Sequence, residues 1–468
     1  MRSPRPHARA FFLGLSTGAV YFAGTLYWLV ETMTTFGGLP TALAVIAAAL
    51  LVAYLALFPA AFAVIVRRLV EAVGPMGLLF AVPAWLTGEL GRQYVWDGFP
   101  WALLGYSQVT WLPIAQTASL VGVYGLSALL ALASSAAAIA IVGGRRRWAP
   151  AAVTIAIVAG CTLWGSHRMA AGALTSGGAP VRVAVLQGNV EQDQKWDPAL
   201  VDQISNRYFD MSRQAIDAGA TFVLWPESSA PFLLDRDILR GAEVRRIARD
   251  GHVTMLVGSD QIEPADHGAD VKRATRYYNA AFLIRPDGLV GAVYRKMHLV
   301  PFGEYVPLKR LLFFVDAITG FPDFSPGQES VLLPVGAHAA STAICYEVIY
   351  GNMIRTSVLA GSQLLTTITN DAWYGRSSAA YQHWAQASMR AIENGRYLAR
   401  AANTGISGFV DPYGRVLDAS GLFEQRLLVA DLQFVSAATV YSRIGDLVAW
   451  LSLLITVGAL LAQWRVRR

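Results

Sequence analysis

Apolar and polar positions divide the sequence into two kinds of region. Residues 10–165 form nearly continuous apolar stretches, whereas residues 181–440 alternate short apolar runs with amphipathic ones. A further apolar run extends from about Asp446 to Trp464. Because a helix needs about 20 mostly apolar residues to cross a bilayer, this pattern predicts membrane helices on both sides of a polar domain.

Six apolar stretches approach the length of a membrane span: residues 10–30, 41–66, 75–90, 115–142, 148–165 and 446–464. The third stretch is the shortest and carries Glu89. Basic residues precede the first stretch, as in a signal peptide, but its length and the lack of an Ala-x-Ala site favour an uncleaved span. We predict a transmembrane bundle of about five spans, a globular domain and a C-terminal transmembrane helix, at residues 1–168, 181–440 and 446–464.

Arginine clusters at the ends of alternate spans predict the orientation of the chain. The clusters are Arg2, Arg5 and Arg9; Arg67 and Arg68; Arg145, Arg146 and Arg147; and Arg465, Arg467 and Arg468. Positively charged residues concentrate on the cytoplasmic side of a membrane. Two crossings between Arg68 and Arg145 bring all the clusters to that side, so the globular domain is expected outside the cytoplasm.

The composition agrees with an integral membrane protein. Of the 468 residues, 54% are hydrophobic and only 15% are charged, which excludes an ordinary soluble enzyme. The formal net charge of +6 comes largely from the arginine clusters and gives little reason to expect a nucleic-acid partner. The sequence has no spacing typical of metal ligands or of phosphate-binding glycine loops, so we expect neither a metal nor a cofactor.

The globular domain alternates β-rich runs with helical patterns, which is typical of layered α/β packing. Strands are expected at Val181–Leu186, Phe222–Leu224, Met255–Gly258, Ala280–Ile284, Ser341–Ile344, Leu364–Ile368 and Gly408–Val410. Helical patterns cover about 198–218, 236–249, 347–360 and 381–401. These patterns do not fix the order of the strands.

Cys345 is the strongest candidate for a catalytic residue. It follows an apolar strand in Ile344-Cys-Tyr-Glu347, at a strand-to-helix corner that would expose a nucleophile. The other cysteine, Cys161, lies within a predicted span. A free thiol in an oxidising compartment is a liability unless chemistry needs it. The alternative is a buried structural cysteine.

Charged residues in two upstream motifs could act on this thiol. Glu227, in Trp-Pro-Glu-Ser, is the candidate base if partial burial raises its pKa toward the working range. Lys296 is charged and so cannot be the base, but with the backbone N–H of Tyr346 it could stabilise an oxyanion. The alternative for Lys296 is a surface lysine. Glu304 is expected to orient Lys296 or Glu227, with a structural salt bridge as the alternative.

The remaining candidates have less specific signals. Glu347 is expected either to fix the corner after the nucleophile or to cap the helix that follows. Trp196, Trp373 and Tyr374 are candidates for substrate contacts, although aromatic residues also serve as core. Residues 93–111 carry Tyr94, Trp96, Phe99, Trp101, Tyr106 and Trp111. They predict an aromatic belt at the membrane interface, with lipid binding as the alternative.

These motifs together resemble a known family. Glu227, Lys296 and Cys345 in their contexts resemble the Glu-Lys-Cys triad of the nitrilase, or carbon-nitrogen hydrolase, superfamily. The runs Lys296–Pro307 and Asn370-Asp-Ala-Trp-Tyr-Gly375, with Gln187-Gly-Asn189 and Lys195-Trp-Asp197, are similar to the apolipoprotein N-acyltransferase family in particular. The resemblance covers the globular domain and most of the spans. Family members commonly carry two further N-terminal membrane helices that have no counterpart in this sequence.

The resemblance implies a nitrilase-like α-β-β-α sandwich at the outer face of a bacterial inner membrane. It also implies a monomeric, ping-pong N-acyltransferase that acts on two lipid-anchored partners. The thiol would take a fatty acyl chain from a phospholipid as a thioester and pass it to the α-amine of a diacylglyceryl-cysteine lipoprotein. Glu304 would have an essential supporting role.

Two other functions remain open. A membrane-tethered nitrilase or amidase would use the same three residues on a soluble C–N substrate, with water as the acceptor. A lipoprotein-binding scaffold would retain the fold without the activity, although the complete set of charged residues argues against it.

Overall fold

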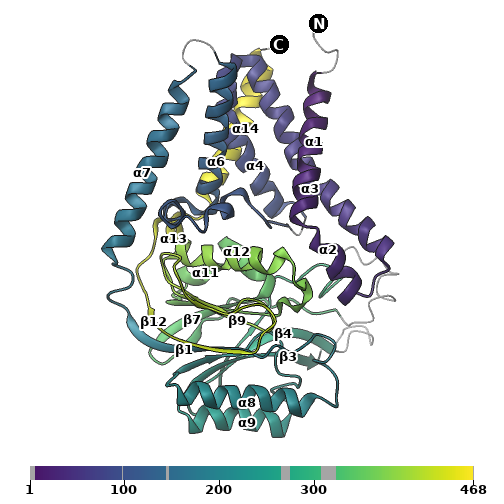
Figure 1. Ribbon diagram of the computed structural model, residues 1–468, viewed down its shortest axis with the longest axis vertical. Helices are drawn as coiled ribbons and strands as arrows, with labels where there is room; N and C mark the ends of the chain where they lie inside the picture. Colours follow the sequence, from purple (N-terminus) through teal and green to yellow (C-terminus); the bar gives the residue numbers. More distant parts are fainter. Residues whose placement is uncertain (1–5, 97, 144–146, 265–274, 307–322, 467–468) are drawn as a thin grey trace.

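The computed structural model describes residues 6–96, 98–143, 147–264, 275–306 and 323–466. Its apolar helices gather at one end, and a sandwich built around two β-sheets occupies the other end (Figure 1). The two apolar regions of the sequence, before and after the globular domain, come together in the helical end. The division that the hydropathy pattern predicts therefore appears as two packed parts of the structure.

Each of the two sheets has six strands and a parallel centre. The first sheet has the order β12-β1-β2-β3-β4-β5, and β2 is parallel to both β1 and β3. The second has the order β11-β10-β9-β8-β7-β6, and β8 is parallel to both β7 and β9. The bounds in the first sheet are β1 Ala179–Gln187, β2 Phe222–Leu224, β3 Thr254–Pro264, β4 Thr275–Ile284, β5 Val290–Arg295 and β12 Arg426–Phe434. Those in the second are β6 Leu333–Val335, β7 His338–Ile344, β8 Leu364–Thr369, β9 Leu398–Ala402, β10 Gly408–Val410 and β11 Val416–Ala419.

Helices cover the outer face of each sheet. α8 (Val201–Asp217) and α9 (Ile238–Asp250) pack on the first sheet, and α11 (Gly351–Leu359) and α12 (Ser378–Asn394) lie over the second (Figure 1). In α8 the buried apolar residues recur every three or four positions, as an amphipathic helix requires. One core fills the space between the sheets and another lies under α8 and α9. The expected α-β-β-α sandwich is confirmed.

The expected helix at 381–401 is wrong in its last third. α12 ends at Asn394, because Gly395 adopts the left-handed conformation (φ 61°) and closes the helix. Residues Leu398–Ala402 instead form β9, whose five residues are all buried at the centre of the second sheet. A fully buried strand shows no alternation of polar and apolar residues, so its pattern resembles that of a buried helix. The expected helix at 347–360 also differs in its first part. The chain there forms the 3₁₀ turn η5 (Cys345–Ile349), and the α-helix α11 begins only at Gly351.

The helical end contains six principal helices: α1 Pro6–Thr25, α3 Thr41–Val73, α4 Ala81–Tyr94, α6 Ala118–Val142, α7 Ala149–Ala171 and α14 Leu447–Val466. By length and composition, four helical stretches among the described residues could cross a membrane. A fifth arises if α1 and the following Trp28–Phe36 segment, bent by 53°, count as one span.

One of these stretches, Thr41–Tyr94, folds back on itself. Gly74 has a φ of 73°, and the chain reverses there through a 3₁₀ turn that ends at Phe80. Ring contacts show that α3 and α4 run antiparallel, because Phe62 meets Trp85 at 5.2 Å and Tyr54 meets Trp96 at 5.1 Å between centroids. Two antiparallel helices, α3 and the 14-residue α4, thus lie where the sequence predicts the 41–66 and 75–90 spans.

Glycines allow close packing of α1 on α3. A Cβ atom added to Gly14 would lie 2.4 Å from the carbonyl oxygen of Pro59, and one added to Gly18 would lie 2.9 Å from the Cα of Ala56. Small residues four positions apart are the usual means by which membrane helices approach each other.

Gly14→Ile is expected to force α1 away from α3 and to destabilise the protein by about 1–3 kcal/mol. Thermal unfolding in detergent would measure the change. Gly24→Ile is the matched control, because Gly24 lies on the same helix and a Cβ added there meets nothing within 4 Å. Equal melting temperatures for the two variants would contradict this close packing of α1 on α3.

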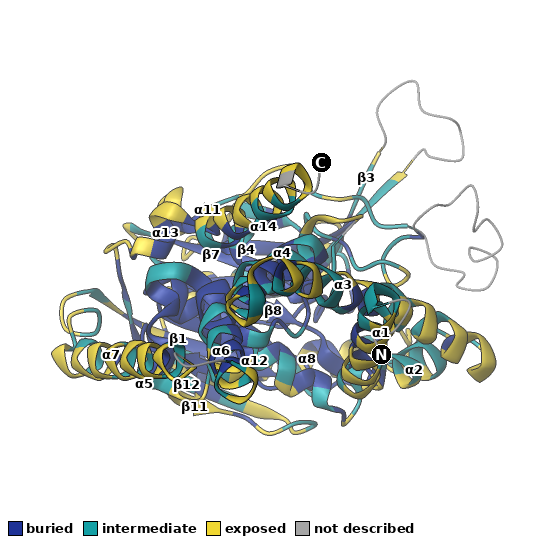
Figure 2. Ribbon diagram, turned by 90° about the horizontal axis from the view of Figure 1, so that it is seen from above, coloured by how far each residue is buried: buried dark blue, intermediate teal, exposed yellow. Residues whose placement is uncertain are grey.

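The sandwich and the helical end share a buried polar contact. α6 is broken at Gly122, which has a φ of 68°, and this break exposes the N–H of Val123. That N–H donates to Oε1 of Glu393, at the end of α12, over 2.9 Å. Arg390 pairs with the same carboxylate at 3.0 Å. Viewed from the helical end, the middle of the molecule is buried whereas much of α7 is exposed (Figure 2).

Candidate active site

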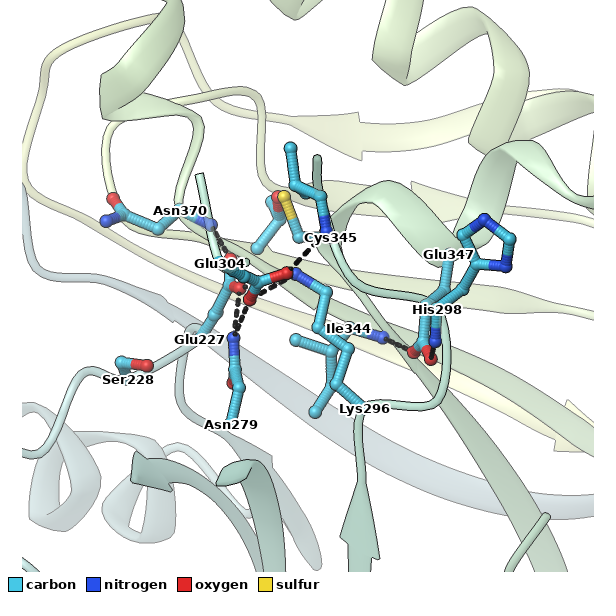
Figure 3. Close-up of polar contacts among 12 residues, drawn as sticks. Glu227, Ser228, Asn279, Lys296, His298, Glu304, Ile344, Cys345, Glu347 and Asn370 are labelled. Carbon is cyan, nitrogen blue, oxygen red and sulfur yellow. Dashed lines mark hydrogen bonds and ion pairs between the residues drawn. The ribbon is translucent and has the colours of Figure 1, made fainter. Parts of the chain in front are cut away.

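Cys345 occupies a strained corner between β7 and η5. Its φ of 53° lies in the left-handed region, which residues other than glycine rarely adopt. Such strain is maintained only where the surrounding structure fixes it, and it is common at functional sites. Figure 3 shows the sulfur of Cys345 on the side of the corner where Glu227, Lys296 and Glu304 meet.

Lys296 lies between the two carboxylates. Its Nζ is 2.8 Å from Oε1 of Glu304 and 3.3 Å from Oε1 of Glu227. Lys296 and Glu227 are almost completely buried, with 1% and 6% of their surfaces exposed. Lys296 directly follows β5, and Glu227 lies just beyond β2, so the carboxyl ends of two strands in one sheet bring them together.

Two asparagines that sequence reasoning missed complete this arrangement. The side-chain amide of Asn279 donates to Glu227 over 2.7 Å and to Glu304 over 2.9 Å. The backbone N–H of Asn370 donates to the other oxygen of Glu227 over 2.7 Å. Asn370 opens the motif that carries Trp373 and Tyr374, so its position beside a sequence signal could have suggested a role. Asn279 lies within β4 and gives no such signal.

The charges of the buried ion pair follow from its contacts. Burial alone would lower the pKa of Lys296, but Glu304 and Glu227 outweigh it and raise the pKa well above its ordinary value. Burial alone would raise the pKa of Glu227, but Lys296, Asn279 and Lys195 lower it below its ordinary value. The expectation that burial raises the pKa of Glu227 is therefore wrong for the resting site, because the paired ammonium dominates.

The thiol of Cys345 is neutral in this site. Burial, followed by the negative charge of Glu227, raises the pKa of the thiol far above its ordinary value. A thiol and an ionised carboxylate therefore face each other beside a fixed ammonium. In attack on a carbonyl carbon, the proton can pass from sulfur to Glu227 as the C–S bond forms, since that bond removes the charge from sulfur. A reagent that needs a preformed thiolate instead depends on the pKa of the thiol alone.

Glu227→Gln is expected to have opposite effects on two reactions of Cys345. Removing the nearby negative charge lowers the pKa of the thiol, so iodoacetamide should alkylate it faster at pH 7 than in the wild type. Attack on a carbonyl substrate should nevertheless slow by about 100-fold or more, because the proton acceptor is lost. Glu243→Gln, in a surface ion pair with Arg246, is the control. Slower alkylation in Glu227→Gln than in the wild type would contradict this electrostatic account.

Glu347 connects the nucleophile corner to the chain after Lys296. Its carboxylate accepts hydrogen bonds from the N–H of Ile344 (2.7 Å), Met297 (2.6 Å) and His298 (3.1 Å), and from the hydroxyl of Tyr294. Burial raises the pKa of Glu347 to about 7 despite these donors. The contacts match both roles expected for Glu347: they fix the corner, and the bond from the N–H of Ile344 caps the start of η5.

The three aromatic candidates separate into two places. Trp196 is 45% exposed and lies near the ammonium of Lys195, 5.6 Å from its ring centroid. The ring of Trp373 meets that of Phe36, from the bent segment, at 5.6 Å. The ring of Tyr374 meets that of Trp28 at 5.1 Å. The loop that carries Trp373 and Tyr374 thus lies against the helical end.

Sequence reasoning also missed Lys195, a second buried ammonium. It is only 4% exposed, and its Nζ lies 3.4 Å from the carbonyl oxygen of Glu227. In the 93–111 segment, Trp101 is 1% exposed and its ring stacks 6.4 Å from that of Tyr346, next to the nucleophile. Trp96, in contrast, is 83% exposed. The segment therefore does not form a uniform belt, because part of it packs on the sandwich.

The groups that can take part in chemistry at this site are the thiol, the paired carboxylates, the buried ammonium and the backbone N–H groups of the nucleophile corner. No cluster of three or more potential metal ligands occurs among the described residues.

Comparison with known proteins identifies the family. Residues 182–441 match the carbon-nitrogen hydrolase family, and residues 1–136 match the apolipoprotein N-acyltransferase N-terminal domain. An apolipoprotein N-acyltransferase from Geobacter metallireducens is 41% identical, over 94% of this chain and 84% of that protein. The chain belongs to the apolipoprotein N-acyltransferase family.

Other members of the apolipoprotein N-acyltransferase family are also similar over most of this chain. The protein from Methylococcus capsulatus is 36% identical, over 94% of this chain and 84% of its own length. The protein from Rhodopseudomonas palustris is 34% identical, over 92% of this chain and 82% of its own length.

Among solved structures, an amidase from Nesterenkonia sp. matches 56% of this chain and 93% of its own at 24% identity, with a TM-score of 0.41.

Proposed function

We propose that this protein transfers a fatty acyl chain from a membrane phospholipid to the N-terminal α-amine of diacylglyceryl-cysteine lipoproteins. One observation carries this proposal. The nucleophile lies where the sandwich meets the membrane helices, since Tyr346, directly after Cys345, stacks on Trp101 from the helical end. A thiol in this place can reach a substrate held in a bilayer. The names of the relatives support the same acceptor.

In the first step, the sulfur of Cys345 attacks the ester carbonyl carbon of the phospholipid while its proton passes to Glu227. The ammonium of Lys296 and the N–H of Tyr346 stabilise the oxyanion, each for about 3 kcal/mol. The C–O bond then breaks, and the proton on Glu227 goes to the departing alkoxide. The products are a lysophospholipid and a thioester on Cys345.

In the second step, the α-amine of the acceptor attacks the thioester carbon and gives a proton to Glu227. The same oxyanion donors act again. The C–S bond breaks, the amide forms and the proton returns to the sulfur. Because one product leaves before the second substrate reacts, we expect ping-pong kinetics.

Anchoring in the membrane serves this reaction in two ways. Both substrates are lipid-anchored, so a site held at the bilayer surface raises their effective concentration. A site that opens toward lipid also excludes water, which would otherwise hydrolyse the thioester. In this arrangement Trp196, Trp373 and Tyr374 contact the substrates, and the protein acts as a monomer without a cofactor.

We infer that the sandwich lies on the periplasmic side of a bacterial inner membrane. Basic helix ends support this orientation, because they meet at the end of the molecule away from the sandwich (Figure 1). His7, at the start of α1, pairs with Glu71 at 3.5 Å, and Gln463, near the end of α14, donates to the carbonyl oxygen of Arg68 over 2.7 Å. Arg2, Arg5, Arg145, Arg146, Arg467 and Arg468 lie outside the described residues.

Reconstitution of the full chain tests this function. The protein would be placed in vesicles of phosphatidylethanolamine with ¹³C-labelled acyl chains, together with a synthetic diacylglyceryl-cysteine peptide. Mass spectrometry should find a labelled long-chain thioester on Cys345 before the peptide is added, and a labelled N-acyl peptide afterwards. A labelled free fatty acid as the only product would contradict the proposal.

The same assay distinguishes the alternative reaction of a membrane-tethered amidase. Incubation with soluble short-chain amides should leave Cys345 unmodified if the acyl donor is a phospholipid. A short acyl thioester that water releases, without any long-chain adduct, would favour the amidase.

A further inference from the structure

We propose that His383 is a positioning residue that holds and polarises the peptide unit supplying the oxyanion-binding N–H of Tyr346. This inference rests on the proposed acyl transfer, in which that N–H stabilises both tetrahedral intermediates. His383 lies on α12, and its imidazole contacts the backbone carbonyl of Cys345 rather than the thiol. It acts through the backbone of the nucleophile.

His383 contacts the nucleophile corner through a hydrogen bond to the backbone. Its Nε2 lies 3.1 Å from the carbonyl oxygen of Cys345, and its side chain is completely buried. A carbonyl oxygen can only accept, so Nε2 carries the hydrogen. The bond holds the residue whose φ of 53° is the strained feature of the site.

Two charged residues fix the orientation of the imidazole. Nη2 of Arg400 lies 3.0 Å from Nδ1 of His383 and 2.8 Å from Oδ2 of Asp371. Oδ1 of Asp371 also lies 3.0 Å from Nδ1 and accepts from the hydroxyl of Thr369 over 2.8 Å. Burial and the charge of Arg400 lower the pKa of His383, and Asp371 opposes this shift. Nε2 carries a hydrogen whether the ring is neutral or charged, because the carbonyl of Cys345 can only accept.

The covalent geometry of the backbone links this bond to catalysis. The carbonyl of Cys345 and the N–H of Tyr346 belong to one planar peptide unit. A donor on the oxygen of a peptide increases the dipole of that unit and strengthens donation by its N–H. It also fixes the plane of the unit, and therefore the direction of the N–H. By donating to the carbonyl oxygen of this peptide unit, the imidazole thus orients and polarises its N–H, which is the oxyanion donor.

The helix that carries His383 is held from the membrane side. Oε1 of the preceding residue, Gln382, accepts hydrogen bonds from the indoles of Trp28 (3.3 Å) and Trp101 (2.6 Å). Both tryptophans come from the helical end, and α12 lies between that end and the second sheet (Figure 1). The imidazole is therefore held by Asp371 and Arg400 within the sandwich, and its helix is held by tryptophans of the helical end.

The test compares acylation with alkylation in His383→Leu and His383→Gln. Acylation of Cys345 by phospholipid passes through an oxyanion, whereas alkylation by iodoacetamide does not. His383→Leu should slow acylation by about 10- to 100-fold, less than the roughly 100- to 1,000-fold loss caused by removing an oxyanion donor outright. Its alkylation rate should stay within about twofold of the wild type. His383→Gln keeps an N–H donor for the carbonyl and should recover most of the acylation rate.

The controls separate this role from a structural one. His338→Leu removes another histidine of the sandwich, which contacts Gln363 at 3.1 Å, and should change neither rate. Wild-type acylation by His383→Leu would overturn the inference, as would a parallel fall in acylation and alkylation or a His383→Gln variant as slow as His383→Leu. Failure of the wild-type protein to form an acyl-enzyme would instead count against the proposed function.

Discussion

Cys345→Ala is expected to abolish acyl transfer, with a loss of at least about 10,000-fold, while the protein remains folded. Alanine cannot form the thioester on which both steps depend. The thiol is neutral, so its removal leaves no charge unpaired, and alanine fits the space it leaves. Mass spectrometry of the enzyme after incubation with labelled phospholipid, with product formation and thermal unfolding measured in parallel, checks both parts of this expectation.

Cys161→Ala is the matched control for this experiment. Cys161 is the only other cysteine of the chain and lies on α7, within the helical end. Its removal should leave the acyl-enzyme and the product unchanged. Acylated product from Cys345→Ala at more than the background rate would show that another group attacks the phospholipid.

Lys296→Met is expected to affect both stability and catalysis. Methionine fills a similar space but leaves the buried carboxylates of Glu227 and Glu304 without their cation. Breaking a buried ion pair in this way destabilises a protein by about 3–5 kcal/mol. Loss of the oxyanion donor should also reduce acyl transfer by about 100- to 1,000-fold in the protein that remains folded.

The stability loss in Lys296→Met should depend on pH in a definite direction. Without the ammonium, burial raises the pKa of Glu227 above the value of about 4.3 that a glutamate has in the unfolded chain. The folded variant then binds protons more tightly than the unfolded one, so its stability falls as the pH rises above about 4.5. Thermal unfolding at pH 5 and pH 8 should show a larger deficit at pH 8.

Arg285→Met provides the comparison for Lys296→Met. Arg285 pairs with Asp287 at 2.6 Å, but both side chains are about half exposed. Solvent screens an exposed pair and makes its contribution to stability small, so this variant should unfold close to the wild type at both pH values. A Lys296→Met protein as stable as Arg285→Met would show that the buried charges are not coupled as the distances indicate.

The sequence predicts the sandwich, the membrane passes and the three principal residues of the site. Local signals carry this information, because strands such as β7 end in polar motifs and spans have a characteristic length. Glu227, Lys296 and Cys345 lie far apart in the chain, yet each lies at or just beyond the end of a strand of the structure. The shared edge of the sheets explains why they converge.

The parts that the sequence did not predict depend on tertiary contacts. Asn279 and His383 have ordinary local contexts, and only the packing of β4 against Glu227 and of α12 against Cys345 gives them a role. The expected direction of the Glu227 pKa shift is wrong for the same reason. Burial follows from the apolar context of Glu227, but the cation 3.3 Å away decides the balance. The segment beyond Asn394 forms β9 rather than a helix, because burial on all sides hides the periodicity of a strand.

The contact between Glu393 and Val123 has a consequence for how this enzyme can be studied. A membrane helix whose break is capped by a carboxylate from the sandwich cannot be detached without removing a hydrogen-bond donor from that buried carboxylate. A fragment trimmed to residues 181–440 would carry Arg390 and Glu393 on a newly uncovered apolar face. We therefore expect the isolated sandwich to be less stable than the full chain, which makes the full chain the form to study.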